Sequence, residues 1–222
     1  GENSIQEMVN AAMELNYEYV GISDHSPSVT NRGMFEVLGI IEKTKRTIEQ
    51  INDSTQSIRV LYGYEVNILV DSTLSMPNEL LEKLDYCIAS IHTGFNQSKE
   101  EVTARLISAI ENPFVTFIGH PSSRLINQRD PIDVDWTKVF DACVENNTFL
   151  EINAQPDRLD LADDLVMDGL SRGVKFVINT DSHSKSSLGL MKYGIDVARR
   201  AGLTKDLVLN TYSLKDLLKS IK

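Results

Sequence analysis

Short apolar runs alternate with helix-like segments along the whole chain of 222 residues. A β-branched and apolar run that includes Val177 and Ile178 is followed by Asp181-Ser182-His183 and then by apolar residues at helical spacing. Five further strand-like runs occupy Tyr19–Ser23, Ile58–Tyr64, Tyr86–Ile91, Phe114–Gly119 and Thr148–Ile152. This regular alternation predicts a parallel sheet whose strands are connected by crossover helices.

Helix signals fill the intervals between these runs. The capping boxes Ser4-Ile5-Gln6-Glu7 and Ser98-Lys99-Glu100-Glu101 predict two helix starts. Periodic apolar residues predict further helices over 38–51, after Pro77, over 136–143, 161–170 and 188–198, and after Ser213. The three acidic residues Asp160, Asp163 and Asp164 are expected to be charges at a helix N-terminus. The predicted fold class is α/β, and a barrel fits better than an open sheet because it brings many strand ends to one face.

Composition restricts the class of protein further. No Pro/Gly-rich linker interrupts the chain, so residues 1–222 are expected to form a single domain. No apolar run approaches the roughly 20 residues of a membrane span. The two cysteines, Cys87 and Cys143, lie in core-like patterns, which predicts reduced thiols and a cytoplasmic protein. The net charge of −10 argues against a broad DNA-binding surface, although a metal site can make a locally positive pocket for phosphate.

Polar residues of metal-ligand type follow the strand-like runs. All four histidines of the chain lie just past such runs, at His25, His92, His120 and His183, and they are accompanied by the carboxylates Asp24, Glu65 and Asp181. A single histidine there is usually a polar or capping residue, but four of four predict a common site. Imidazole and carboxylate ligands suit zinc, manganese or iron better than calcium. Several such ions together activate water and stabilise a phosphoryl displacement.

Some candidates allow a second interpretation. Asp24 could orient a neighbouring ligand rather than bind metal, and Glu65 could simply end a strand. The loop residues Arg124, Arg129 and Arg158 could grip phosphate oxygens or be solvated surface arginines. Asn153 could bond substrate or close a turn. The chain contains no Walker-type phosphate loop, dinucleotide fingerprint or serine-nucleophile elbow.

Several stretches together resemble the PHP (polymerase and histidinol phosphatase) domain, and most narrowly the C-terminal PHP domain of bacterial and archaeal family X DNA polymerases. The matching stretches are Gly21–Ser26, Gly63–Val66, Ala89–His92, Gly119–Pro121, Leu150–Ala154, Arg158–Leu161, Asn179–Ser184 and Met191–Gly194. The resemblance implies a distorted (β/α)7 barrel holding two or three divalent ions (manganese, zinc or iron). It matches His25, Glu65, His92, His120, Asp181 and His183 to metal ligands, and Asp181, His183 and His25 are also the expected catalytic residues.

The resemblance also implies a function. We expect a metal-dependent phosphoesterase, the 3′-5′ exonuclease and 3′-end processing part of a family X DNA polymerase that acts in DNA repair. An upstream polymerase region would supply affinity for DNA. One alternative is a stand-alone phosphatase of small phosphomonoesters, similar to histidinol phosphatase. Another is a structural or docking domain with an inactive site, against which the intact set of ligand types argues.

Two departures from the family pattern affect these expectations. The opening H-x-H motif and the Ser-Asp-Gly that follows it are absent, and Gly1 resembles the last residue of that motif. We therefore expect the first strand and its ligands to be missing from this sequence, which predicts weakened metal binding and weak or no activity of the chain as it stands. Asn67 and Ser72 replace the Asp and Gly that relatives often carry, which puts no ligand in doubt.

Overall fold

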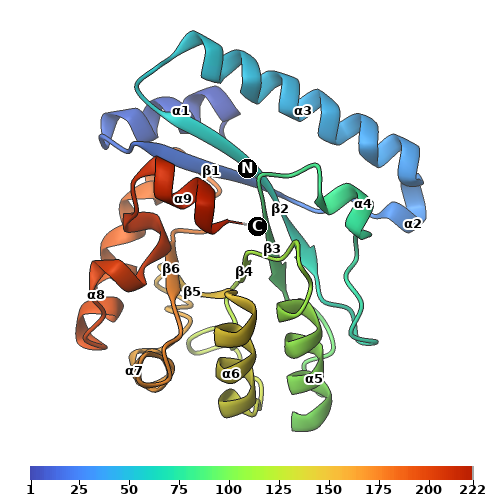
Figure 1. Ribbon diagram of the computed structural model, residues 1–222, viewed down its shortest axis with the longest axis vertical. Helices are drawn as coiled ribbons and strands as arrows, with labels where there is room; N and C mark the ends of the chain where they lie inside the picture. The colour runs from blue at the N-terminus through green and yellow to red at the C-terminus, as the bar shows by residue number, and fades with distance from the viewer. Residues whose placement is uncertain (222) are drawn as a thin grey trace.

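A computed structural model describes residues 1–221 of the chain. Within these residues six parallel strands form one sheet in the order β1-β2-β3-β4-β5-β6. The strands are β1 (Tyr19–His25), β2 (Arg59–Asn67), β3 (Tyr86–Ser90), β4 (Phe117–Ile118), β5 (Phe149–Asn153) and β6 (Phe176–Asn179). The sheet curls into a half-barrel (Figure 1), which confirms the α/β class and the distorted barrel architecture.

Most helices lie on the convex side of this half-barrel, whereas the C-terminal helix lies at its open side, where Leu217 packs with inward-facing strand residues such as Leu61 and Phe149 (Figure 1). The helices are α1 (Ile5–Glu14), α2 (Val29–Arg32), α3 (Met34–Ser54), α4 (Asn78–Leu81), α5 (Lys99–Ile110), α6 (Trp136–Asn146), α7 (Asp163–Ser171), α8 (Met191–Arg200) and α9 (Leu214–Ser220). Three 3₁₀ segments are η1 (Lys185–Leu190), η2 (Lys205–Leu207) and η3 (Leu209–Thr211). Both predicted capping boxes are present, with Ser4 paired to Glu7 and Ser98 to Glu101. No helix of the described part is long and apolar enough to span a bilayer.

Side chains alternate between two cores along each strand, because successive residues of a strand point to opposite faces. The outer core lies between the sheet and the helices and includes Val60, Tyr62, Tyr64 and Val66 of β2. The inner core fills the concave side of the half-barrel and comprises Leu61, Tyr86, Ile88, Phe117, Phe149, Val177, Leu209 and Leu217. Farther along β2 the inward positions become polar, so a polar layer lies on the inner core at the carboxyl ends of the strands.

Glycines make room for an aromatic ring on the inner face. A Cβ atom on Gly21 would lie 2.6 Å from the Tyr86 hydroxyl oxygen, and one on Gly63 would lie 2.6 Å from the ring. Tyr86 in turn stacks on Phe117, with ring centroids 6.3 Å apart. The inner core beneath the polar layer is therefore closely packed, as the interior of a barrel requires.

The C-terminal segment connects the two edge strands of the sheet. The Asn210 side chain accepts a hydrogen bond from the backbone N–H of Ile178 in β6 (3.1 Å) and donates one to the Ile178 carbonyl (2.5 Å). At the other edge, the Tyr19 hydroxyl of β1 donates to the Tyr212 carbonyl (2.9 Å). These contacts tie residues 210–212 to both β1 and β6.

Two local expectations need correction. Strand β4 covers only Phe117–Ile118, because the Asn112 carbonyl and side chain accept the backbone N–H groups of Val115 and Phe114 and keep this part in a turn. Asp160 is not an exposed charge at a helix start. It is fully buried, and its carboxylate accepts the backbone N–H of Ser122 (3.1 Å).

Candidate metal centre

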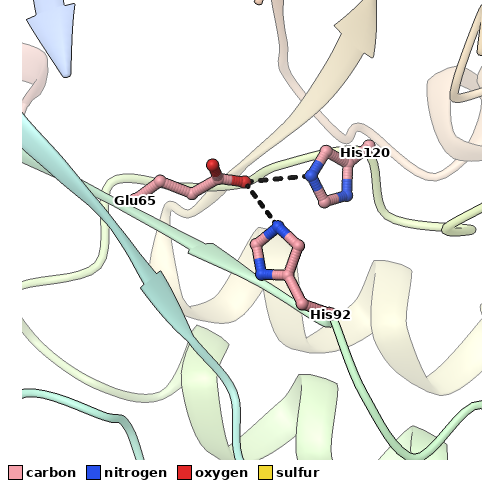
Figure 2. Close-up of side chains that lie close together, drawn as sticks. All are labelled: Glu65, His92 and His120. Carbon is pink, nitrogen blue, oxygen red and sulfur yellow. Dashed lines mark ion pairs between the residues drawn. The ribbon is translucent and has the colours of Figure 1, made fainter. Parts of the chain in front are cut away.

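Glu65 lies at the centre of a cluster of three imidazoles. Its Oε1 atom is 2.9 Å from Nε2 of His120 and 3.3 Å from Nε2 of His92 (Figure 2). Its other oxygen, Oε2, is 3.1 Å from Nδ1 of His25. The ligand atoms of Glu65, His92 and His120 all lie within 4.8 Å of one another. One carboxylate and two imidazoles can therefore face a single ion.

The parallel sheet explains why these residues meet. His25 and Glu65 are directly opposite each other in the register of β1 and β2, so both side chains project from the same face. His92 follows the last residue of β3 by two positions, and His120 follows β4 by two. All four therefore come from the carboxyl ends of adjacent strands, where the sequence pattern placed them.

His183 and Asp181, which follow β6, extend the cluster across the opening of the half-barrel. Ring centroids are 5.1 Å apart for His92–His120, 6.1 Å for His25–His92 and 6.0 Å for His25–His183. His120 is at the bottom, with 4% of its side chain exposed, whereas 68% of His25 and 63% of His183 is exposed. The structure thus brings all four histidines together. That they bind metal remains a prediction.

Burial and hydrogen bonding act in opposite directions on the pKa values of the cluster. Burial alone would raise the pKa of Glu65, but hydrogen bonds from His120 and His92 outweigh it and hold that pKa well below its usual range. Burial would lower the pKa of His120, but its hydrogen bond to Glu65 and the charge of Glu151 outweigh it, so the pKa is raised. The cluster therefore pairs a charged carboxylate with a histidine that readily takes a proton.

Residues outside the predicted set hold these side chains in place. Asn67 Oδ1 is 2.6 Å from Nδ1 of His92, and Glu151 Oε2 accepts the backbone N–H of His120 at 2.6 Å. Glu151 is buried, and burial, the largest cause, raises its pKa to about 7. The sequence carried a signal for both residues: Asn67 lies two positions after Glu65 and Glu151 two before Asn153, so each pair shares a face of its strand.

The backbone is in the left-handed region at both ends of the cluster. His120 has φ of 30° and Asp181 has φ of 47°, and neither residue is a glycine. Such angles are uncommon for residues with a Cβ atom, and they persist only where the surrounding structure holds them. Gln155 holds the second of these turns, because its side-chain amide donates to the carbonyls of Thr180 (2.5 Å) and Asp181 (3.0 Å).

The three loop arginines have different surroundings. Arg158 reaches the cluster, with its Nε 3.8 Å from Oδ2 of Asp181. Arg124 donates from Nε to the Arg158 carbonyl (2.7 Å) and from Nη2 to the Leu159 carbonyl. Arg129 donates to the Ser123 carbonyl (2.7 Å) and lies over the ring of Phe95. Arg124 and Arg129 therefore hold loops together, and Arg158 is the arginine placed to meet a substrate.

Asn153 and Asp24, for which the sequence left two interpretations open, lie in different surroundings. Asn153 is fully buried, and its amide nitrogen donates to Glu151 Oε2 and to Asp181 Oδ2, both at 3.2 Å, so it faces the protein rather than a substrate. Asp24 is paired in register with Tyr64, whose side chain belongs to the outer core. Because neighbouring strand residues face opposite ways, Asp24 points away from the cluster that His25 joins.

The chemistry of the cluster fits a divalent transition metal. Two imidazole nitrogens and a carboxylate oxygen are ligands that zinc, manganese and iron accept. The Nε2 atoms of His92 and His120 both face Glu65, and the opposite nitrogen of His92 is held by Asn67, as is usual for metal-binding histidines. The fold and the cluster together define a class of protein: an α/β half-barrel with side chains of metal-ligand type at the carboxyl ends of its strands.

Comparison with family models narrows this class. The model described as PHP domain matches residues 1–155, a range that contains Glu65, His92 and His120. The chain therefore belongs to the PHP family.

Individual relatives are of two kinds. The chain is 38% identical over its whole length to the DNA polymerase/3′-5′ exonuclease PolX of Bacillus subtilis (strain 168), and it spans 39% of that protein. It is 29% identical to a probable phosphatase of Thermoanaerobacter sp. (strain X514), with 99% of this chain and 89% of the phosphatase aligned. A probable phosphatase of Acetivibrio thermocellus is 28% identical over 94% of this chain and 85% of its own length. Together with the family match, these similarities support a hydrolase of phosphoesters.

Proposed function

We propose that residues 1–222 form one metal-dependent phosphoesterase domain whose site is the cluster around Glu65. The observation that carries this proposal is the convergence of Glu65 with His25, His92 and His120. Two or three divalent ions (manganese, zinc or iron) would be held by Glu65, His92 and His120 together with His25, Asp181 and His183. Such ions supply Lewis-acid activation of water and neutralise charge on a phosphoryl group.

The remaining side chains suggest how a phosphoester would be handled. His25 and His183 are exposed at the rim, where an imidazole can accept or give a proton at the substrate. The Asp181 carboxylate lies between His183, whose Nδ1 is 3.9 Å from Oδ1, and Arg158, whose Nε is 3.8 Å from Oδ2. The guanidinium of Arg158 can donate two parallel hydrogen bonds to phosphate oxygens, which a lysine could not do. We therefore assign His25, Asp181 and His183 to catalysis and Arg158 to phosphate binding.

The substrate that we favour is the 3′ end of DNA. In support, the relative from Bacillus subtilis carries both polymerase and 3′-5′ exonuclease in its name, and the similarity extends over all of this chain. The net charge of −10 fits this proposal if a neighbouring polymerase region supplies the affinity for DNA. The domain would then contribute 3′-end processing to DNA repair.

A second candidate is a phosphatase of small phosphomonoesters. The observation that favours it is length, because the aligned region covers 89% of the Thermoanaerobacter probable phosphatase but only 39% of PolX. An open site whose rim histidines are largely exposed would accept either substrate.

The two candidates are separated by relative rates. The protein as its gene encodes it would be assayed with manganese on a 3′-phosphorylated single-stranded oligonucleotide and on p-nitrophenyl phosphate, with chelator as the control. Our proposal predicts metal-dependent cleavage with higher kcat/KM on the oligonucleotide. Higher kcat/KM on the small ester would favour the phosphatase, and no metal-dependent hydrolysis of either would overturn both. An Arg158→Leu variant should raise KM more than it lowers kcat.

A further inference from the structure

Glu151 is a buried carboxylate at the base of the cluster, and only 4% of the residue is exposed. It projects from β5 on the same side as Phe149 of the inner core, so it lies in the polar layer directly above packed apolar side chains. Burying a carboxylate costs several kcal/mol unless hydrogen bonds compensate. An apolar residue at this position would be less costly for folding alone.

The carboxylate of Glu151 accepts three hydrogen bonds, all from residues at the carboxyl ends of strands, where the cluster lies. Oε2 accepts from the backbone N–H of His120 (2.6 Å) and from the amide of Asn153 (3.2 Å). Oε1 accepts from the amide of Asn179 (2.9 Å). The three donors come from the end of β4, from β5 and from β6, so one side chain connects three strand ends. No lysine or arginine forms an ion pair with Glu151 among the residues that the structure describes.

The hydrogen bond to His120 is made at a residue whose backbone has an unfavourable, positive φ. His120 is held at φ of 30°, and its N–H points down at Glu151 while its Nε2 points at Glu65. A residue with a Cβ atom remains in this region only when its surroundings hold it there. Glu151 therefore sets the direction from which the imidazole of His120 approaches Glu65.

The bond to Asn153 extends the same control to Asp181. The Asn153 amide nitrogen donates to both Glu151 Oε2 and Asp181 Oδ2, and its Oδ1 accepts the backbone N–H of Gln155 (3.0 Å). All polar groups of the Asn153 side chain are thus used within the protein. The amide therefore connects the carboxylate of Glu151 to that of Asp181. The backbone of Asp181, like that of His120, is in the left-handed region.

From these contacts we propose that Glu151 is a positioning residue of the metal centre, which holds His120 through its backbone and Asp181 through Asn153. This inference rests on the proposed function. It assigns to Glu151 a role in the site, although Glu151 itself does not touch the substrate. Partners that orient metal ligands in this way typically change metal affinity by 10- to 100-fold when they are removed.

The test is the affinity for Mn²⁺ of the variant Glu151→Gln in the protein as its gene encodes it, measured by the electron paramagnetic resonance signal of free Mn²⁺. Glutamine keeps the shape but replaces one acceptor oxygen by an NH₂ donor, which must then face one of three N–H groups. We expect binding about 10- to 100-fold weaker than in the wild type. Hydrogen exchange at the His120 amide should become faster in the metal-free variant.

Asp85→Asn is the matched control. Asp85 precedes β3, at the opposite end of the sheet, and its Oδ2 accepts the backbone N–H of Tyr62 (2.8 Å). The same carboxylate-to-amide change there should alter stability and leave Mn²⁺ affinity unchanged. If Glu151→Gln binds Mn²⁺ as tightly as the wild type, the positioning role is overturned and Glu151 only supports the fold. If the wild type itself binds no Mn²⁺, the proposed function fails first and this inference fails with it.

A second variant tests the connection from Glu151 through Asn153 to Asp181. It also provides a test if Glu151→Gln does not fold. Asn153→Ala should weaken Mn²⁺ binding without disturbing the contact between Glu151 and His120. Wild-type affinity in this variant would contradict the connection through Asn153. In the double variant the loss should be close to that of Glu151→Gln alone, because Glu151→Gln already disturbs the connection to Asp181 that runs through Asn153. Fully additive losses would show two independent effects and overturn the connection.

Discussion

Glu65 divides its two oxygens among three histidines, since Oε1 faces His92 and His120 and Oε2 faces His25. The raised pKa of His120 and the lowered pKa of Glu65 are two sides of the same hydrogen bond. A metal ion needs the same imidazole nitrogens in their neutral form. Protons and metal therefore compete for this cluster.

This competition predicts a pH dependence of metal binding. Because the pKa of His120 is raised above its usual 6.5, Mn²⁺ affinity should increase as the pH rises through and above that value. The stability that protonated His120 gives the metal-free protein has the opposite sign. It is complete below pH 6.5 and is lost as the pH rises through the raised pKa. Mn²⁺ titrations and urea unfolding of chelator-treated protein across this range would measure both, and affinity that falls with rising pH would contradict the assignment.

Removing the imidazole at the bottom of the cluster should weaken Mn²⁺ binding more than removing a positioning residue does. We expect His120→Ala to lose more than about 100-fold in Mn²⁺ affinity, beyond the range of outer partners. Ile118→Ala serves as the control, because Ile118 is fully buried in β4 but contributes no ligand. It should cost about 2–5 kcal/mol of stability and leave the affinity for Mn²⁺ nearly unchanged. Equal loss of affinity in both variants would show that His120 acts only through stability.

At the scale of the elements, the cluster depends on how closely β3 and β4 approach at their carboxyl ends. A Cβ atom on Gly119 would lie 2.5 Å from Ser90 Oγ and 2.8 Å from Ile88 Cγ2. No side chain larger than hydrogen fits there without moving β3. Gly119 therefore permits the approach that places His120 beside His92.

Gly119→Ala should cost about 1–3 kcal/mol through overpacking and should also weaken Mn²⁺ binding. Gly39→Ala is the matched change: Gly39 lies in the second turn of α3, and nothing lies within 4 Å of the position of its Cβ atom. That substitution should stabilise the protein by up to about 1 kcal/mol, because alanine is the better helix former. Chemical unfolding with Mn²⁺ titration would compare the two, and a neutral Gly119→Ala would contradict the close packing.

The elements that the sequence predicted well are those with strong local signals. Capping boxes and short β-branched, apolar runs located α1, α5 and most strands, because these signals act over a few residues. The shortness of β4 depends on how Asn112 holds the preceding turn. The burial of Asp160 depends on a contact with Ser122, thirty-eight positions earlier. Side-chain partners of this kind are set by tertiary packing, and no local pattern reports them.

The same limit applies to the site. The positions of His25, Glu65, His92 and His120 could be predicted from where strands end, since parallel strands bring those ends together. The roles of the arginines could not be predicted in this way, because Arg124 and Arg158 are both polar loop residues in the sequence. Only the fold shows that one donates to backbone carbonyls while the other reaches Asp181.

At the scale of the whole molecule, metal binding should increase the free energy of unfolding. A ligand that binds only the folded state at 100 times its Kd adds about 2.7 kcal/mol. For a chain of this size that corresponds to a rise of about 5–10 °C in Tm. We expect this rise with Mn²⁺ or Zn²⁺, its reversal by chelator, and little rise in His120→Ala. Differential scanning calorimetry would measure it, and an equal rise in the variant would mean that the ions bind elsewhere.

The most direct test of the metal centre is elemental analysis of the protein as its gene encodes it, purified, equilibrated with manganese or zinc and freed of unbound metal. The wild type should retain two or three ions per chain, and Glu65→Gln should retain fewer, because Glu65 contacts three of the histidines. If the wild type retains no ion even when both metals are supplied, the cluster is a hydrogen-bonded polar core and the phosphoesterase assignment is wrong.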